Sequence, residues 1–241
     1  MATVILVRHG RSTANATGVL AGRLPDVHLD DAGVAQAVAV GERLSGVRLA
    51  AAVTSPLERC RETAREITRR QGARLRASVD RQLSECDYGE WQGRALKDLA
   101  KEKLWKTVQS QPSAATFPGG ESMRAMQDRG VAAIRRHDAR ITQEHGEGAV
   151  WLAVSHGDVI KSILADALGT HLDLFQRIHI DPASVSVIRF TETRPFVLGT
   201  NTHGGDLAWL TPPARGGGKR RRSGDAQVGG GAGPAAAGEG S

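Results

Sequence analysis

Short runs rich in β-branched residues alternate with helical stretches along most of the chain, and this alternation restricts the fold more than any other feature. The runs have the length of strands and are bounded by residues typical of turns. They predict six strands, at residues 3–7, 49–54, 73–79, 149–154, 184–190 and 195–200. We therefore expect an α/β fold, a three-layer sandwich with a mostly parallel central sheet and helices on both faces. The last two strands are expected to form a hairpin at one edge.

Helical periodicity fills the stretches between these runs. It predicts five helices, at residues 32–44, 55–70, 95–108, 122–144 and 158–168. The second helix is expected to begin with Ser55 as its N-cap and Pro56 at its first position, an arrangement common at helix N-termini. Its apolar side chains, among them Cys60, Ala64 and Ile67, are expected to face the sheet.

The last thirty residues differ from the rest in composition. Residues 212–241 contain ten Gly, six Ala and three Pro, and almost no large apolar side chain. Such a segment buries too little surface to offset the entropy that is lost on ordering. We therefore predict one folded domain over residues 1–211, followed by a disordered Gly/Ala/Arg-rich tail over 212–241.

Membrane and secreted proteins are not expected from this composition. No apolar run reaches the ~20 residues needed to span a bilayer. The N-terminus has no basic region ahead of its apolar run, which argues against a secretory signal. Two cysteines, Cys60 and Cys86, are too few for a disulfide framework in a chain of 241 residues. We expect a cytoplasmic protein whose thiols are reduced.

The net charge of +6 is divided between the tail and the core, and the tail supplies half of it. The core is therefore only mildly basic, which suits an enzyme with anionic substrates without requiring one. The cluster of basic residues from Arg215 to Arg222 leaves open a non-catalytic protein that binds nucleic acid or acidic partners through its tail. Such a contact would be salt-sensitive and independent of base sequence, and no aromatic residues accompany it, so nucleic acid is not expected as the main partner.

Arginine or histidine residues follow three of the predicted strands. The first strand leads into Arg8 and His9, the second into the segment that carries Arg59, and the fourth into Ser155 and His156. In an open α/β sheet, ligands bind outside the carboxyl ends of the strands. The sequence therefore directs two histidines and two arginines to one crevice. A helix also begins near each strand end, and its free N–H groups favour an anion.

Arg59 lies at an unusual place for a structural residue. It belongs to the first turn of a predicted helix, where the helix dipole disfavours a cation. For a lone arginine at such a place, a solvent-facing side chain is the common alternative. Because Arg8, His9 and His156 are expected nearby, we favour an arginine that contacts a bound anion.

Five blocks of the sequence form a set of motifs. They are VILVRHGRSTAN at 4–15, TSPLERCRET at 54–63, LSECDYGEWQG at 83–93, PGGES at 118–122 and VSHGDVI at 154–160. In this order and spacing they resemble the histidine phosphatase superfamily, which includes the cofactor-dependent phosphoglycerate mutases. An RHG triplet alone recurs by chance, but five ordered blocks over about residues 3–200 are specific. The resemblance implies the phosphoglycerate mutase-like α/β fold.

The resemblance also implies a phosphatase that hydrolyses small phosphorylated metabolites. His9 would attack phosphorus in line and form a phosphohistidine that water then hydrolyses, and its imidazole must be neutral to do so. Arg8 and Arg59 would hold the phosphoryl oxygens with their planar guanidinium groups. His156 would donate a further hydrogen bond to the charge that develops there. No cofactor is implied, and the sequence carries no motif of a metal site.

Two further positions take roles from the same resemblance. Glu85 matches the acid that protonates the leaving oxygen and then acts as base on water, and its neighbour Asp87 is the local rival for that role. Asn15 matches a position that hydrogen-bonds the phosphoryl group. Gly157, like Gly10, is expected to let the backbone approach phosphate closely.

Arg11 departs from the pattern of the superfamily, since many members carry Glu or Gln directly after the RHG triplet. We expect Arg11 to add positive charge at the rim of the pocket and to affect the choice of substrate rather than the phosphoryl step.

A phosphomutase is the main alternative to a phosphatase. The mutases of this superfamily carry a longer insertion before the PGGES block, whereas the segment 94–116 is short here, although four lysines make it basic. We therefore favour the phosphatase. The loops that select the substrate carry no readable code, and a homodimer is left open.

Overall fold

A central sheet of six strands organises the part of the chain that the computed structural model describes, residues 1–71, 75–205, 207 and 210. The strands are β1 (Thr3–Arg8), β2 (Leu49–Thr54), β3 (Ala77–Val79), β4 (Val150–Ser155), β5 (Val185–Phe190) and β6 (Pro195–Thr202). Their order across the sheet is β3-β2-β4-β1-β5-β6. β1, β2, β3 and β4 pair in parallel, and β5 runs antiparallel to β1 and to β6. The mostly parallel sheet with a hairpin at one edge is thereby confirmed.

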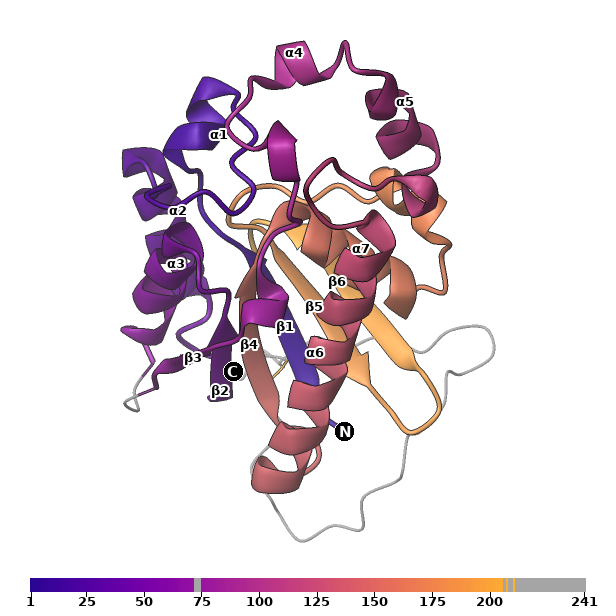
Figure 1. Cartoon of the computed structure of the whole chain (residues 1–241). Coiled ribbons are helices and arrows are strands. Elements are labelled where there is room, and N and C mark those ends of the chain that lie inside the picture. Colours follow the sequence, from indigo (N-terminus) through magenta and orange to yellow (C-terminus); the bar gives the residue numbers. More distant parts are fainter. Residues whose placement is uncertain (72–74, 206, 208–209, 211–241) are drawn as a thin grey trace, which may run out of the picture.

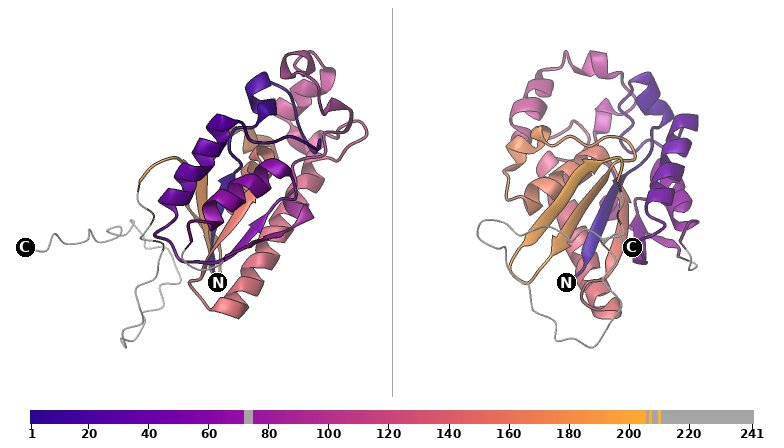
Figure 2. Two further views of the ribbon diagram at one scale, coloured as in Figure 1. Left: turned by 90° about the vertical axis from the view of Figure 1, so that its left-hand side faces the viewer. Right: turned by 180° about the vertical axis from the view of Figure 1, so that it is seen from behind.

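Helices cover both faces of this sheet, as Figure 1 and the turned view in Figure 2 (left) show. The α-helices are α1 (Thr13–Thr17), α2 (Asp31–Arg43), α3 (Glu58–Thr68), α4 (Leu96–Leu99), α5 (Lys103–Ser110), α6 (Met123–His145) and α7 (Gly157–Ala167). Short 3₁₀ helices occur at Arg81–Leu83, Gly89–Trp91, Pro112–Ala114 and Leu172–Arg177. α2 and α3 pack on one face, and α6 and α7 pack on the other. The predicted three-layer α/β sandwich is confirmed.

Strand β1 contributes to both hydrophobic cores because its side chains alternate between the two faces of the sheet. Ile5 and Val7 belong to the cluster that includes the apolar residues of α2 and α3. Val4 and Leu6 belong to the cluster that includes those of α6 and α7. The strand is thus fixed from both sides, and its carboxyl end has a defined position.

Three predicted elements differ from the observed ones by more than two residues at a boundary or by a break. α3 begins at Glu58 rather than at Ser55, with Leu57 as an N-cap that makes no side-chain hydrogen bond. The hydroxyl of Ser55 lies ahead of the helix, where it accepts from the N–H of Leu57 at 3.4 Å and contacts a histidine described below. The predicted helix at 95–108 is divided into α4 and α5, since Glu102 takes an extended conformation. Strand β3 is limited to three residues.

The carboxyl ends of β1, β2 and β4 point toward the same side of the molecule, the upper side in Figure 1, where α1, α4 and α5 lie beyond the sheet. The backbone N–H of His9 donates to the carbonyl oxygen of Ser155 at 3.0 Å, which joins the ends of β1 and β4. Within the described residues, no helix combines the length and apolar character needed to cross a membrane. The tail predicted at 212–241 lies outside the described residues.

Candidate active site

His9 follows β1 directly and is buried, with 4% of its surface exposed. Its Nδ1 lies 2.7 Å from the carbonyl oxygen of Gly10. A carbonyl oxygen only accepts hydrogen bonds, so this contact places the ring proton on Nδ1 and the lone pair on Nε2. Nε2 in turn accepts a hydrogen bond from Nε of Arg59 at 3.2 Å. The tautomer and the direction of the lone pair are therefore fixed by protein groups.

The imidazole of His9 is also held in its neutral form. Burial, together with the charges of Arg59 and Arg8, lowers the pKa of His9 well below 6.5. The hydrogen bond to the Gly10 carbonyl opposes this shift without cancelling it. A neutral imidazole with its lone pair on Nε2 is the form that acts as a nucleophile once the hydrogen bond from Arg59 is released.

Two guanidinium groups lie near His9, and each has one buried nitrogen without a hydrogen-bond partner among the described residues. Nη1 of Arg8 donates to the carbonyl oxygen of Ile180 at 2.7 Å, and Nη2 of Arg59 donates to that of Gly22 at 2.7 Å. Nε of Arg8 and Nη1 of Arg59 are buried and have no hydrogen-bond partner among the described residues. A buried donor without a partner costs about 1–3 kcal/mol, and more when it is charged. Two such donors beside a nucleophile fit an anion with several acceptor oxygens.

The position of Arg59 agrees with the prediction of an anion contact rather than a solvated side chain. It is the second residue of α3 and only 2% exposed. Since the dipole disfavours a cation in this turn, local helix energetics do not explain a buried arginine here.

His156 is the N-cap residue of α7 and lies across the site from His9, with ring centroids 5.2 Å apart. Its Nδ1 lies 3.2 Å from Nη2 of Arg59, and its Nε2 lies 2.7 Å from Oγ of Ser55. A guanidinium only donates, so Nδ1 accepts and Nε2 donates to the Ser55 hydroxyl. Burial, together with Arg59 and His9, lowers the pKa of His156 well below 6.5. Both ring nitrogens are therefore engaged within the protein, and the predicted hydrogen bond to a phosphoryl oxygen stays a prediction.

Glu85 lies in a segment between two 3₁₀ helices and is 9% exposed. Its Oε1 accepts a hydrogen bond from the backbone N–H of Cys86 at 2.9 Å. Burial, followed by the nearby charge of Asp158, raises the pKa of Glu85 to about 7. A carboxyl group with this pKa exchanges protons readily at neutral pH, as a general acid and base must.

Asp87, the rival of Glu85, has a different environment. Its Oδ1 accepts from the N–H of Gly89 at 3.1 Å, and its Oδ2 lies 3.6 Å from Nη1 of Arg23. These contacts engage both carboxylate oxygens of Asp87, which favours Glu85 as the acid.

Asn15 and Arg11 are engaged with neighbours outside this cluster of buried residues. Oδ1 of Asn15 accepts from the N–H and the Oγ of Ser12 at 3.1 and 2.9 Å, which completes a capping box at the start of α1. Arg11 is 47% exposed, and its Nε donates at 2.7 Å to Oδ2 of Asp30, the N-cap of α2. Their predicted contacts with substrate stay predictions.

The two glycines of the motifs have different reasons to be glycine. A Cβ at Gly157 would lie 3.5 Å from Nε of Arg8, which is one of the donors without a partner, so a larger side chain would crowd the anion site. A Cβ at Gly10 would instead clash with the carbonyl group of Gly33 in α2. The close approach that the structure shows at Gly10 is therefore to the backbone of a helix, and its predicted approach to phosphate stays a prediction.

Two residues of the site were not identified from the sequence. Ser55 is predicted as a helix cap, whereas its hydroxyl is the partner of Nε2 of His156. Asp158 accepts a hydrogen bond from the Tyr88 hydroxyl at 2.8 Å and acts on Glu85 through its charge. The signal for Asp158 was its place directly after the His156–Gly157 pair, at the end of a strand that already carried site residues.

No group of three or more His, Cys, Asp or Glu side chains is arranged to hold a metal ion within the described part of the chain. The positive charge of the site comes from Arg8 and Arg59.

A buried, neutral histidine beside two arginines, at the carboxyl ends of parallel strands, is the arrangement expected of an α/β protein that handles phosphoryl groups. The sequence profile of the histidine phosphatase superfamily (branch 1) matches residues 4–203, and the chain belongs to this family. The superfamily predicted from the five motifs is thereby confirmed, together with an enzyme of the phosphoric monoester hydrolase class.

Curated relatives carry both phosphatase and mutase names. Phosphoglycerate mutase-like protein 4 of Arabidopsis thaliana is 36% identical over 166 residues, which cover 67% of this chain and 69% of that protein. Phosphoserine phosphatase 1 of Hydrogenobacter thermophilus is 29% identical over 203 residues, covering 83% and 92%. A bifunctional protein of Mycobacterium tuberculosis is 33% identical over 193 residues, covering 78% of this chain but only 50% of that protein.

Among solved structures, the alpha-ribazole phosphatase from Shigella flexneri is similar over 83% of this chain and 96% of its own. The TM-score is 0.73 and the sequence identity is 25%. The likeness extends over nearly the whole part of the chain that forms the sheet and its helices.

Proposed function

We propose that the chain is a phosphomonoesterase that hydrolyses small phosphorylated metabolites through a phosphohistidine on His9. The observation that carries this proposal is the position of Nε2 of His9, which holds a fixed lone pair on a neutral ring and lies between Arg8 and Arg59. Each arginine has a buried donor that lacks a partner among the described residues. A phosphoryl group has enough acceptor oxygens to satisfy both donors while phosphorus faces the lone pair.

The reaction then takes two displacements. In the first, Nε2 of His9 bonds to phosphorus as the ester P–O bond breaks, and Glu85 gives its proton to the departing oxygen. In the second, Glu85 takes a proton from water, the water oxygen bonds to phosphorus, and the P–N bond breaks. Inorganic phosphate leaves, and His9 and Glu85 return to their starting protonation states. Arg8 and Arg59 offset the charge on the phosphoryl oxygens in both steps, so the proposal calls for no metal or cofactor.

His156 and Ser55 support this chemistry in the proposal. Substrate that draws Arg59 toward its oxygens would release Nδ1 of His156. For the ring to donate to the phosphoryl group, the proton would move to Nδ1 and the Ser55 hydroxyl would then donate to Nε2. Arg11 is proposed to contact the non-reacting part of the substrate near the pocket rim, and Asn15 to hydrogen-bond the phosphoryl group.

A phosphomutase is the second candidate, since mutase names occur among the relatives. A mutase must protect its phosphohistidine from water and return the phosphoryl group to a second hydroxyl. The short segment 94–116, which forms only α4, α5 and a 3₁₀ turn, favours a site that water enters. The phosphatase is therefore the preferred function.

The proposed location is the cytoplasm, in agreement with two cysteines, Cys60 and Cys86, that are buried and free. The partner proposed is a phosphorylated small molecule. A non-catalytic role for the basic tail and a homodimer are the remaining alternatives, and the tail lies outside the described residues.

A panel of phosphorylated metabolites tests the proposal. Purified protein is incubated with each compound, and free phosphate and isomerised phosphoester are both quantified. Release of one phosphate per ester consumed supports the phosphatase. Transfer to another hydroxyl of the same compound, without phosphate release, identifies the mutase. No turnover of any phosphoester would contradict both.

A further inference from the structure

The segment that carries Glu85 has no regular secondary structure of its own, so its backbone groups need other partners. Carbonyl groups in such a segment find neither a strand nor a helix partner, and leaving them unpaired when buried is costly. Oγ of Ser155 donates to the carbonyl oxygen of Leu83 at 2.8 Å. The carbonyls of Gln82, Ser84 and Glu85 all accept from arginine side chains.

One arginine of α6, Arg129, makes most of these bonds. Its Nη1 donates to the carbonyls of Gln82 at 2.6 Å and Ser84 at 2.8 Å, and its Nη2 donates to that of Glu85 at 3.0 Å. Nη2 and Nε also donate to the two carboxylate oxygens of Glu121, at 2.6 and 3.0 Å. All five N–H groups of the guanidinium are thus engaged in one plane. The side chain is 14% exposed, so water competes weakly for these bonds.

Glu121, of the PGGES block, connects Arg129 to the other side of the segment. Its Oε1 accepts from the backbone N–H of Asp87 at 2.9 Å and from Nη2 of Arg23 at 2.7 Å. Burial opposes ionisation of Glu121, but the hydrogen bonds from Arg129 and the Asp87 N–H outweigh it and lower the pKa below its ordinary value. Glu121 is therefore a carboxylate that can hold several donors at once.

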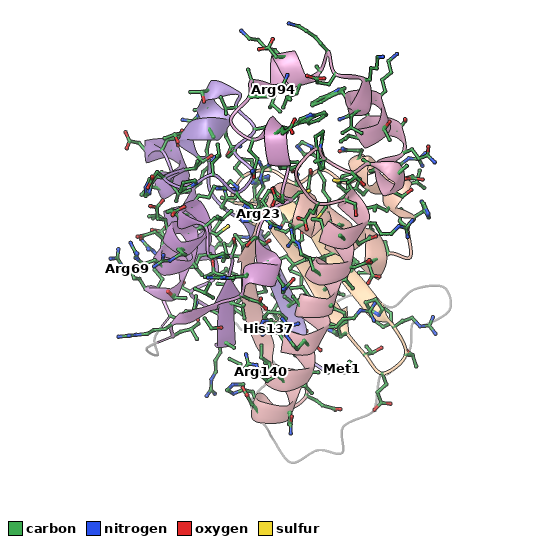
Figure 3. All side chains as sticks on the ribbon, viewed as in Figure 1. Met1, Arg23, Arg69, Arg94, His137 and Arg140 are labelled. Atoms are coloured by element: carbon green, nitrogen blue, oxygen red, sulfur yellow. The ribbon has the colours of Figure 1, made fainter. Side chains whose placement is uncertain are left out.

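Arg23 donates to the same carbonyl oxygen of Glu85 as Arg129 does. Its Nε donates to the carbonyl of Glu85 at 2.8 Å, so this single oxygen accepts from both Arg23 and Arg129. Figure 3 shows Arg23 near the centre of the molecule. Arg140, on the same helix as Arg129, lies toward the bottom of that view. The residue before Arg23 is Gly22, whose carbonyl accepts from Arg59. The network therefore joins the Glu85 segment to the phosphoryl-binding arginine.

We propose that Arg129 and Glu121 are positioning residues that aim the Glu85 carboxyl group at the leaving oxygen, an inference that rests on the function proposed above. The carboxyl group bonds to the next backbone N–H, that of Cys86, so its direction follows the local backbone. Arg129 and Glu121 fix that backbone on both sides of Glu85, at the carbonyls of 82, 84 and 85 and at the N–H of 87. Neither residue needs to touch the substrate.

Arg129→Lys is the substitution that separates position from charge. A lysine keeps the cation but has three donors on one atom, so it cannot serve three carbonyls and a carboxylate in one plane. We expect kcat for an alkyl phosphate to fall by up to about 100-fold, because small misplacements of a catalytic group have effects of this size. KM should change little. The burst of nitrophenol from p-nitrophenyl phosphate should be retained, since this leaving group needs little protonation.

Glu121→Gln is the second variant, and Arg140→Lys is the matched control. The glutamine keeps one acceptor oxygen but places an amide opposite Nε of Arg129. Arg140 lies on the same helix and pairs only with Glu144 among the described residues, at 2.8 Å, so its substitution should leave all rates unchanged. A displaced Glu85 should also be better solvated. Its pKa should then fall from about 7, and the alkaline limb of the kcat/KM profile should move to lower pH.

The outcomes distinguish this inference from the proposed function. Slower alkyl ester turnover with a retained burst and a shifted alkaline limb supports positioning. Wild-type turnover and an unchanged pH profile in both variants would overturn it. Equal loss of turnover and burst, or failure of both variants to fold, would also overturn it, because the network would then be purely structural. Absence of phosphohistidine in the wild-type protein would instead contradict the proposed function itself.

Discussion

Nε of Arg59 donates to Nε2 of His9 across 3.2 Å, and this bond occupies the lone pair that attacks phosphorus in the proposed reaction. A guanidinium at this place excludes a second proton from the ring, in agreement with the lowered pKa of His9. Attack requires the donor to leave the ring nitrogen. A phosphoryl oxygen that accepts from Arg59 would replace Nε2 of His9 as its hydrogen-bond partner. Substrate binding and exposure of the nucleophile would therefore occur together.

Removal of the nucleophile tests the first step. His9→Ala should abolish phosphate release while the free energy of unfolding stays close to wild type, since no neighbour can replace the ring. Wild-type protein should accumulate an acid-labile phosphate on His9, and the variant should not. His145→Ala, which removes a histidine at the exposed end of α6, is the control. Near wild-type phosphate release by His9→Ala would rule out the proposed mechanism.

The two arginines at positions 59 and 11 should differ strongly in effect. Arg59→Ala should lower kcat/KM by about 100-fold or more, because a buried charged donor at the phosphoryl group is lost. Arg11→Ala should change kcat/KM only a few-fold, since its side chain is half exposed and paired with Asp30. Rates are measured on one alkyl phosphate, with unfolding curves to confirm that both variants fold. Small effects of similar size would remove Arg59 from the site.

The strand ends explain why the main site residues could be predicted from the sequence. Parallel strands deliver their carboxyl ends to one edge, so Arg8, His9 and His156 converge whatever the details of the loops. The same rule places Arg59 at this edge, because it lies in the first turn of the helix that follows β2. The capping box of Asn15 with Ser12 could also be predicted from spacing alone, because Ser12 lies three positions before Asn15 and both are short polar residues.

The contacts that the sequence did not indicate are those between distant segments. Arg129 bonds to the carbonyl of Glu85, 44 positions away, and no local pattern specifies which of the many arginines of α6 does so. The role of Ser55 was assigned to a helix cap because a Ser-Pro pair is typical of helix starts, whereas its partner His156 is 101 positions away. Local propensity cannot register such tertiary contacts.

The pH dependence of kcat/KM should be bell-shaped. The reaction needs His9 neutral and Glu85 protonated. Burial, with Arg59 and Arg8, lowers the pKa of His9 well below 6.5, so the acid limb lies below that pH. Burial, with Asp158, raises the pKa of Glu85 to about 7, so activity on an alkyl phosphate should fall as pH rises through about 7.

Asp158→Asn isolates the enzyme's contribution to this profile. Loss of the neighbouring negative charge should lower the pKa of Glu85 and move the alkaline limb to lower pH. The substrate phosphate also titrates near pH ~6, but it does so equally with both proteins. An alkaline limb that does not move in Asp158→Asn would show that Glu85 does not set it.

Glu85 should make the free energy of unfolding fall as pH rises, whereas a carboxylate whose pKa is lowered on folding makes it rise. Its folded-state pKa is about 7, above the unfolded value of about 4.3, so the folded state prefers the protonated form. This contribution is fully present below pH ~4.3 and is lost as pH rises through about 7. Glu85→Gln should therefore gain stability relative to wild type as pH rises from about 5 to about 8. Urea unfolding at several pH values measures this, and Glu147→Gln, at a largely exposed site, should show no such trend.

Glu85→Gln should also separate proton transfer from phosphoryl binding. The amide keeps the shape and can still accept from the Cys86 N–H, but it cannot give a proton to a departing alkoxide. Turnover of an alkyl phosphate should fall by about 10²–10⁴-fold. With p-nitrophenyl phosphate the first step should suffer less, so a burst of nitrophenol should persist even if hydrolysis of the phosphohistidine slows. Asp87→Asn is the comparison and should retain most activity on both substrates. Near wild-type turnover of both esters by Glu85→Gln, with loss of activity in Asp87→Asn, would transfer the acid role to Asp87.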